Sequence, residues 1–179
     1  MIDHYYLNRR EDVIRYANPN GVGIELGVAE GEFSERILRE TQNSNFYLYS
    51  VDMWAGDRGH DVAQYSRVIN RLDKYKNRNS VIKLTFDEAL PLFPDNYFDF
   101  IYVDGYAHTG EENGKTFYDW FPKLKNGGIM AGDDYHDNWP LVKNAVDLFS
   151  SNIKRDLHVI NCHEPNSVWS EYPTWFVFK

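Results

Sequence analysis

The sequence predicts an α/β fold in which a doubly wound, mostly parallel β-sheet lies between two layers of helices. Short apolar runs alternate along the chain with segments of helical periodicity, which is the pattern of a wound parallel sheet. Glycine or aspartate stands at or just after the end of four of these runs. Two further apolar runs near the C-terminus predict closing strands that form an antiparallel pair. Together these observations predict a three-layer α/β/α architecture.

The apolar runs define the predicted strands. Five of them are expected to lie parallel, at residues 22–26, 46–51, 81–86, 98–103 and 129–132. The last is expected to begin after a turn at 126–128, where two glycines are adjacent. The two closing strands are expected at residues 158–161 and 174–178.

Helical periodicity predicts the elements between the strands. A helix is expected over residues 32–39, after the first strand. A longer helix follows the second strand, and its spacing predicts a buried stripe made of Val62, Tyr65, Ile69 and Leu72.

The remaining helices are predicted from aromatic spacing and from helix-start signals. A helix over 111–124 carries Phe117 and Trp120 inward, and another begins near Pro140 after the fifth strand. Residues 1–17 are predicted to be a helix that packs over one edge of the sheet or over the mouth of its site.

The length and charge predict one domain and exclude one class of partner. A chain of 179 residues fits a single domain, 1–179, in which residues 1–20 form an N-terminal cap segment. The net charge of −8 argues against nucleic acid as a partner, because nucleic-acid binding needs clustered Lys and Arg. The short basic groups at Arg9-Arg10 and 74–78 are expected to be solvated helix faces.

The sequence also predicts the cellular location. It has no apolar tract that could cross a bilayer, and its first residues lack the basic start and apolar stretch of a secretory signal. A single cysteine, Cys162, excludes an internal disulfide framework. We therefore expect a cytoplasmic protein without a membrane partner.

The turn after the first predicted strand carries the first functional signal. It spans residues 25–31 and reads E-L-G-V-A-E-G, so its glycines follow G-x-x-x-G instead of the G-x-G-x-x-G of dinucleotide-binding turns. The carboxylates of Glu25 and Glu30 would repel a diphosphate but suit a ligand that bears an ammonium and a sulfonium. Asp52 ends the second strand, 25 residues after Gly27, where an acid can accept hydrogen bonds from both ribose hydroxyls.

This turn resembles the first motif of class I S-adenosylmethionine-dependent methyltransferases, which have a Rossmann-like fold, and Asp52 matches their second-strand acid. The resemblance covers roughly residues 20–179 in the same element order. It implies that the cofactor S-adenosylmethionine lies across the ends of the first two strands. The residues implied to bind or border it are Glu25, Gly27, Gly31, Asp52, Met53, Trp54, Asp87 and Asp104.

A second cluster narrows the resemblance. The segments F-D-F-I-Y-V-D-G-Y-A-H, at 98–108, and A-G-D-D-Y, at 131–135, are similar to those of macrocin-type sugar O-methyltransferases, and more distantly to catechol O-methyltransferase. In those enzymes the matching acids bind a divalent cation, which implies Mg²⁺ at Asp104, Asp133 and Asp134. Carboxylates that converge at adjacent strand ends repel one another unless they are protonated or bridged by a cation, and all-oxygen ligation suits Mg²⁺. Such an ion would acidify and aim the acceptor hydroxyl.

Two histidines are candidates for the general base. His108 lies four residues past Asp104, and an imidazole can take a proton from an acidified alcohol. Related enzymes often read D-G-x-H, whereas this chain has one more residue between Gly105 and His108. His136, just past the acidic pair, is the alternative. Asp104 and His108 are the predicted catalytic residues.

The predicted reaction is O-methylation of a sugar or glycoconjugate hydroxyl. The Asn-Pro-Pro-aromatic motif that nucleobase and amide N-methylating enzymes place after the fourth strand is absent, and Asp104-Gly105-Tyr106-Ala107 stands there instead. A catechol or phenol acceptor is the alternative. From other classes, an NAD-dependent oxidoreductase and an inactive cofactor-binding module stay open. Few residues lie outside the sheet and its helices, which predicts an open site for a glycan, or for a small molecule covered by a partner subunit of a homo-oligomer.

Overall fold

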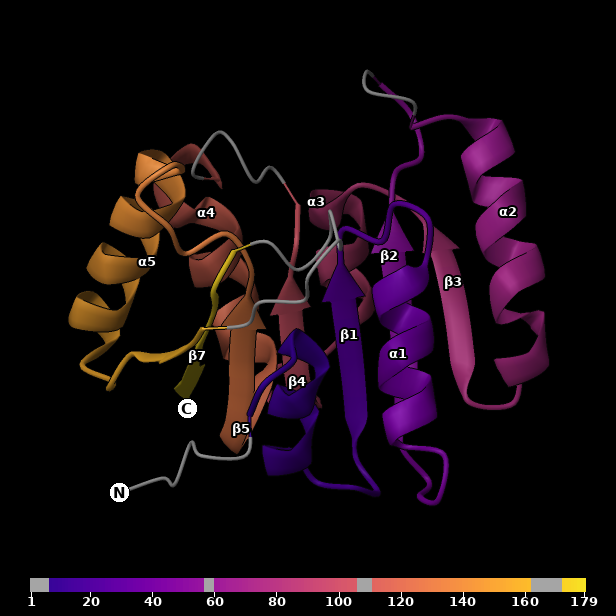
Figure 1. Cartoon of the computed structure of the whole chain (residues 1–179), viewed down its shortest axis with the longest axis horizontal. Helices are drawn as coiled ribbons and strands as arrows, with labels where there is room; N and C mark the ends of the chain where they lie inside the picture. The colour runs from indigo at the N-terminus through magenta and orange to yellow at the C-terminus, as the bar shows by residue number, and fades with distance from the viewer. Residues whose placement is uncertain (1–6, 57–59, 106–110, 162–171) are drawn as a thin grey trace.

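The protein is a mixed β-sheet covered by helices on both faces. The computed structural model describes residues 7–56, 60–105, 111–161 and 172–179. These residues form a seven-stranded sheet in the order β3-β2-β1-β4-β5-β7-β6 (Figure 1). The strands are β1 (Val22–Leu26), β2 (Tyr47–Asp52), β3 (Asn79–Lys83), β4 (Phe98–Val103), β5 (Leu124–Gly132), β6 (His158–Ile160) and β7 (Thr174–Phe178).

The pairing of these strands confirms the predicted fold class. Strands β1 to β5 are parallel, and β7 lies antiparallel between β5 and β6. The chain order reverses between β1 and β4, and in such sheets ligands bind beyond the carboxyl ends of the strands at this point. The carboxyl ends of β1, β2, β4 and β5 therefore form the edge on which a site is expected.

The helices form two layers. The chain order gives α1 (Glu32–Glu40), α2 (Val62–Leu72), α3 (Phe86–Ala89), α4 (Glu111–Trp120) and α5 (Pro140–Ile153), with a 3-10 helix, η2 (Arg10–Tyr16), before β1. One apolar cluster packs η2, α1 and α2 against one face of the sheet, and a second packs α3, α4 and α5 against the other. Figure 1 shows η2 as a short indigo helix in front of β4 and β5.

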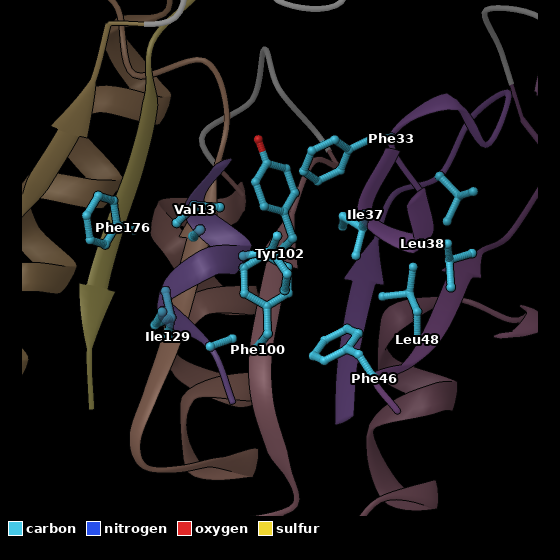
Figure 2. Packing of buried hydrophobic residues seen from close by; sticks show 14 of the residues in the cluster. Val13, Phe33, Ile37, Leu38, Phe46, Leu48, Phe100, Tyr102, Ile129 and Phe176 are labelled. Carbon is cyan, nitrogen blue, oxygen red and sulfur yellow. The ribbon is translucent and has the colours of Figure 1, made fainter. Parts of the chain in front are cut away.

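The cluster beneath η2 and α1 is rich in aromatic rings. Phe33 from α1 lies with its ring centroid 4.1 Å from that of Tyr102 on β4. Figure 2 shows these two rings side by side, with Phe100 below Tyr102 on the same strand. Val13 of η2 is fully buried in the same cluster. This packing brings the start of η2 to the carboxyl end of β4.

Several predicted boundaries differ from the structure. Strand β5 begins at Leu124, so the glycine pair at 127–128 lies inside the strand, where its pairing with β4 shifts register. Gly127 adopts φ 79°, a conformation open to glycine, so the strand continues through an irregularity where the sequence predicted a turn. The predicted helix at 1–17 is observed as η2, from Arg10 to Tyr16, while residues 1–6 lie outside the described part of the chain.

The predicted buried stripe of α2 is wrong in two of its four positions. Val62 is 63% exposed and Ile69 is 39% exposed, whereas Val68 and Leu72 are buried. Val68 packs next to Gly31 at the start of α1, so the face that contains Val68 is the one that meets α1. Gln64 is also buried on this face. Because its side chain is polar, the sequence pattern did not indicate that this face is buried.

Truncating Val68 and Val62 should distinguish the buried face of α2 from its exposed face. Val68→Ala removes two buried methyl groups and should lower the free energy of unfolding by about 2 kcal/mol. Val62→Ala, the matched control, removes the same atoms from an exposed position and should change it by less than about 0.5 kcal/mol. Urea unfolding followed by circular dichroism measures both. Equal losses in the two variants would contradict the observed orientation of α2.

Candidate active site at the strand ends

The turns after β1 and β4 are in direct contact. Gly27 adopts φ 96°, and a Cβ atom placed on it would lie 2.5 Å from the backbone oxygen of Asp104. A side chain at position 27 would therefore push the two strand ends apart. Gly31, at φ 76°, precedes α1, where an added Cβ would lie 3.2 Å from Val68. Both predicted motif glycines are thus required by local geometry, and Gly27 brings Asp104 next to the first turn.

Asp52 closes the first turn from the end of β2. One carboxylate oxygen accepts hydrogen bonds from the backbone N–H groups of Val28 and Ala29, at 2.9 and 3.0 Å. The other oxygen accepts from the N–H of Trp54 at 3.1 Å. Two successive N–H groups in such a turn would otherwise form a nest for an anion. Because Asp52 occupies this nest, the turn offers those two groups to no phosphate.

Glu25 lies beneath the turn, where it is 1% exposed. A hydrogen bond joins its carboxyl group to the hydroxyl of Ser34, which also lies 2.8 Å from the hydroxyl of Ser50. Burial raises the pKa of Glu25 to about 8, against the smaller opposing effects of Ser34 and Arg10. Glu25 is therefore largely protonated at neutral pH in the free protein.

Two other residues of the predicted cofactor set are engaged by other groups of the chain. The Trp54 indole is 1% exposed, donates to the backbone oxygen of Ala29 at 3.0 Å and packs against Tyr65. It braces the turn and offers no open ring face for stacking on adenine. Asp87, at the start of α3, forms an exposed ion pair with Lys115 at 2.7 Å.

Met53 and Glu30 also lie near the first turn. Met53 is 38% exposed beside Asp52 and keeps an accessible apolar side chain at the end of β2. Glu30, in the first turn, pairs with Arg67 of α2 at 2.7 Å, so its charge is neutralised by the neighbouring helix.

Arg10 is a functional residue that the sequence interpretation missed. Its side chain is 7% exposed, and one guanidinium nitrogen donates to Asp133 at 2.7 Å and to Asp104 at 3.1 Å. The guanidinium carbon lies 4.0 Å from the centroid of the Phe33 ring, within cation–π distance. Burial alone would lower the pKa of Arg10, but the negative groups around it raise it well above its ordinary value. The prediction that Arg9-Arg10 is a solvated face is therefore wrong for Arg10.

The acids at the ends of β4 and β5 lie close together, and the guanidinium of Arg10 bridges two of them, Asp104 and Asp133. Thr174 donates to the second carboxylate oxygen of Asp133 at 3.2 Å, so both oxygens of Asp133 are engaged. Burial and the charges of Asp133 and Asp104 raise the pKa of Asp134 to about 8. Within the described residues, no group of three His, Cys, Asp or Glu side chains is arranged to hold a metal ion.

A small cleft opens beside these acids, between the strand ends and helices α4 and α5. The space between its described walls is about 250 Å³, a figure that includes open solvent, so the cleft is shallow and little of it is enclosed. The lining residues are Val103, Asp104, Gly105, Phe117, Asp133, Asp134, Val142 and Trp175. The cleft is thus continuous with Asp104, which also contacts the first turn.

Of the two candidate bases, His108 lies outside the described residues. His136 is described, and its Nδ1 atom accepts the backbone N–H of Asn138 at 3.1 Å. In a neutral ring the remaining nitrogen then carries the proton, so His136 has no free nitrogen with which to accept another.

A family comparison decides the class of this site. A family model described as a methyltransferase domain matches residues 24–135, more than half of the chain, from β1 to just past β5. The chain belongs to this methyltransferase family. A methyltransferase fold implies S-adenosylmethionine as the cofactor and argues against the NAD-dependent oxidoreductase.

Solved structures with the same fold support this assignment at the level of architecture. A Staphylococcus aureus protein assigned as a caffeoyl-CoA O-methyltransferase superposes with a TM-score of 0.67 at 18% identity, over 100% of this chain and 85% of that one. An assigned O-methyltransferase from Klebsiella pneumoniae gives 0.69 at 12% identity, over 93% and 76%. An assigned rRNA methylase from Clostridium thermocellum gives 0.65 at 14%, over 94% of both chains. These likenesses concern the fold and leave the acceptor of this methyltransferase open.

A sequence relative adds a segment match. The uncharacterized protein y4gI of Sinorhizobium fredii (strain NBRC 101917 / NGR234) is 30% identical over 94 residues, which cover 50% of this methyltransferase. The matched segment spans only 10% of that protein's length. Among the described residues of the methyltransferase, none of the helices has both the length and the apolar character to span a bilayer.

The buried carboxyl of Glu25 should make stability pH-dependent. Its pKa is about 8 in the folded protein, above an ordinary value of 4.5, so its stabilising contribution is complete below pH 4.5 and is lost as the pH rises through 8. Glu25→Gln keeps the shape but cannot ionise. Between pH 5 and pH 8 its free energy of unfolding should therefore fall less steeply than that of the wild type, by up to about 1.4 kcal/mol per pH unit.

Urea unfolding at four pH values across this range measures the slope. Glu32→Gln is the matched control, because Glu32 lies at the exposed start of α1 with its side chain 40% exposed. An unchanged slope in Glu25→Gln would show that Glu25 is ionised in the folded protein.

Proposed function

We propose that this methyltransferase transfers the methyl group of S-adenosylmethionine to a hydroxyl oxygen of a sugar or glycoconjugate. The donor is expected to lie over the ends of β1 and β2, and the acceptor in the cleft beside Asp104 and Asp134. The observation that carries the proposal is the occupation of the first turn's N–H nest by Asp52. Because Asp52 accepts these N–H groups, the turn cannot offer them to the phosphates of a dinucleotide. The groups at this strand end are carboxylates instead.

The residues present fit a cationic cofactor. Asp104 keeps its side chain 24% exposed at the junction of the turn and the cleft, and Met53 offers an accessible apolar surface beside Asp52. An ammonium or sulfonium near these carboxylates is favoured by Coulomb attraction, whereas a diphosphate is opposed by it. S-adenosylmethionine supplies the electrophilic methyl group when bound.

On the acceptor side, the chain must orient a hydroxyl and remove its proton. Bound S-adenosylmethionine would supply the methyl group to the hydroxyl oxygen, and the chain would have to take up the hydroxyl proton with a base. We assign this role to His108, which follows β4 in the chain, because His136 already accepts a backbone hydrogen bond at Nδ1. Holding the two reactants in line accounts for much of the rate enhancement in such transfers.

The residues do not fit the predicted Mg²⁺ in the observed arrangement. Mg²⁺ needs ligand oxygens at about 2.0–2.1 Å around the ion, and the oxygens of Asp104 and Asp133 that face each other are held by Arg10. No step of the proposed reaction is therefore assigned to a metal.

A sugar acceptor is favoured by the partly exposed aromatic rings that follow Asp134. The rings of Trp139 and His136 lie 5.6 and 5.1 Å from that of Tyr172. Aromatic faces of this kind can pack against the apolar face of a sugar ring. A catechol or phenol is the second candidate, since flat rings would also stack there.

Calorimetric titration and methyl transfer test the proposal. The wild type should bind S-adenosylmethionine and not NAD⁺. Asp52→Ala should weaken binding by about tenfold or more, because two backbone N–H groups of the turn and that of Trp54 lose their acceptor. Transfer from methyl-labelled S-adenosylmethionine is then screened against glycosides and catechols, with product analysis by mass spectrometry. Binding of NAD⁺ alone would refute the donor, and methylation of catechols alone would refute the sugar.

Trp139→Ala separates acceptor binding from cofactor binding. The loss of a stacking ring should raise the KM for a glycoside about five- to tenfold, while the Kd for S-adenosylmethionine stays the same. Leu141→Ala, which removes an exposed side chain from the first turn of α5, is the control and should change neither. An unchanged KM in Trp139→Ala would place the acceptor elsewhere.

A further inference from the structure

Arg10 lies between the carboxylates of Asp104 and Asp133, where a positive charge offsets their mutual repulsion. Its guanidinium nitrogen reaches Asp104 and Asp133 at 3.1 and 2.7 Å from a side chain that is 7% exposed. The aromatic ring of Phe33 lies 4.0 Å from the guanidinium carbon and covers it on one side. The positive charge is therefore both paired and enclosed.

The backbone that carries Arg10 is anchored independently of this contact. The carboxylate of Asp12 accepts the backbone N–H groups of Asn8 and Arg9, each at 3.0 Å, and pairs with Arg15 at 3.0 Å. Arg9 also reaches Glu40 at the end of α1, at 2.7 Å. These contacts fix the backbone at the start of η2. The side chain of Arg10 therefore extends from a fixed point to the strand ends, which lowers the entropy cost of its ion pairs.

A divalent ion at the same carboxylates would have to displace this group. The ion would use the carboxylate oxygens that Arg10 already holds, and the other oxygen of Asp133 accepts from Thr174. Displacement would also leave the guanidinium buried without its charge partners, which is strongly unfavourable. Both oxygens of Asp133 and one oxygen of Asp104 are thus satisfied by the protein itself.

We propose that Arg10 is the resident cation of this site, holding Asp104 and Asp133 in the arrangement that a divalent metal would otherwise impose, so that methyl transfer proceeds without a bound metal. Arg10 is a positioning residue, because it acts on the acceptor through Asp104 and Asp133. The part of the proposal that concerns catalysis rests on the proposed methyl transfer, whereas the part that concerns metal binding does not.

Binding of Mn²⁺, followed by the electron paramagnetic resonance of the free ion, tests the inference without any assay of activity. Wild-type protein should bind no Mn²⁺ at the strand ends, whereas Arg10→Ala should gain about one site. Adding Asp133→Asn to Arg10→Ala should abolish the gained site. Arg15→Ala is the control, because it removes a half-exposed arginine from the same helix and should gain no site.

Activity supplies the second readout. Wild-type transfer should be unaffected by EDTA, whereas Arg10→Ala should lose most of its transfer and recover part of it with Mg²⁺. Wild-type binding of one Mn²⁺ that disappears in Asp133→Asn would overturn the proposal, and this measurement does not require the Arg10 variant to fold. Arg10→Lys keeps a cation and should remain metal-free. If no acceptor is methylated under any condition, the proposed function fails while the Mn²⁺ result still decides the role of Arg10.

Discussion

The ion pairs from Arg10 to Asp104 and Asp133 are the constraint on which the strand-end region depends. Two carboxylates this close inside a protein are mutually repulsive, and removing one partner from such a buried arrangement commonly costs about 3–5 kcal/mol. The guanidinium relieves the repulsion from the face that η2 covers, and leaves the opposite face open as the cleft beside α4 and α5. The N-terminal segment is therefore part of the site as well as a cover for the sheet.

Asp52 performs a comparable task at the first turn. Parallel α/β sheets often present backbone N–H groups at this position to a phosphate, and here the protein's own carboxylate accepts two of them. The result is a first turn whose backbone donors are consumed internally and which presents a carboxylate where a dinucleotide-binding turn presents N–H groups. Such a turn discriminates among cofactors by electrostatics before any specific contact is made, and it favours the positively charged methyl donor of the family to which the chain belongs.

The sequence predicted the sheet better than it predicted the surroundings of the site. The bounds of β1 and β4 agree with the prediction, because strands buried on both faces read as continuous apolar runs. The buried face of α2 was misjudged because its polar Gln64 is buried and its apolar Val62 is exposed, so periodicity favoured the wrong side. The acids at the strand ends could be located, since each follows a strand directly.

Arg10 could not be located in this way, because its partners lie 94 and 123 residues further along the chain and a basic pair on a short helix looks like any solvated surface. A signal was nevertheless present. Acids gathered at one sheet edge need compensating charge, and an N-terminal segment expected to cover that edge is a natural source of it. The same acidic pattern can therefore serve a metal in one chain and an arginine in another. In this chain the residue at the start of η2, and not the acids alone, then sets which cation the strand ends hold.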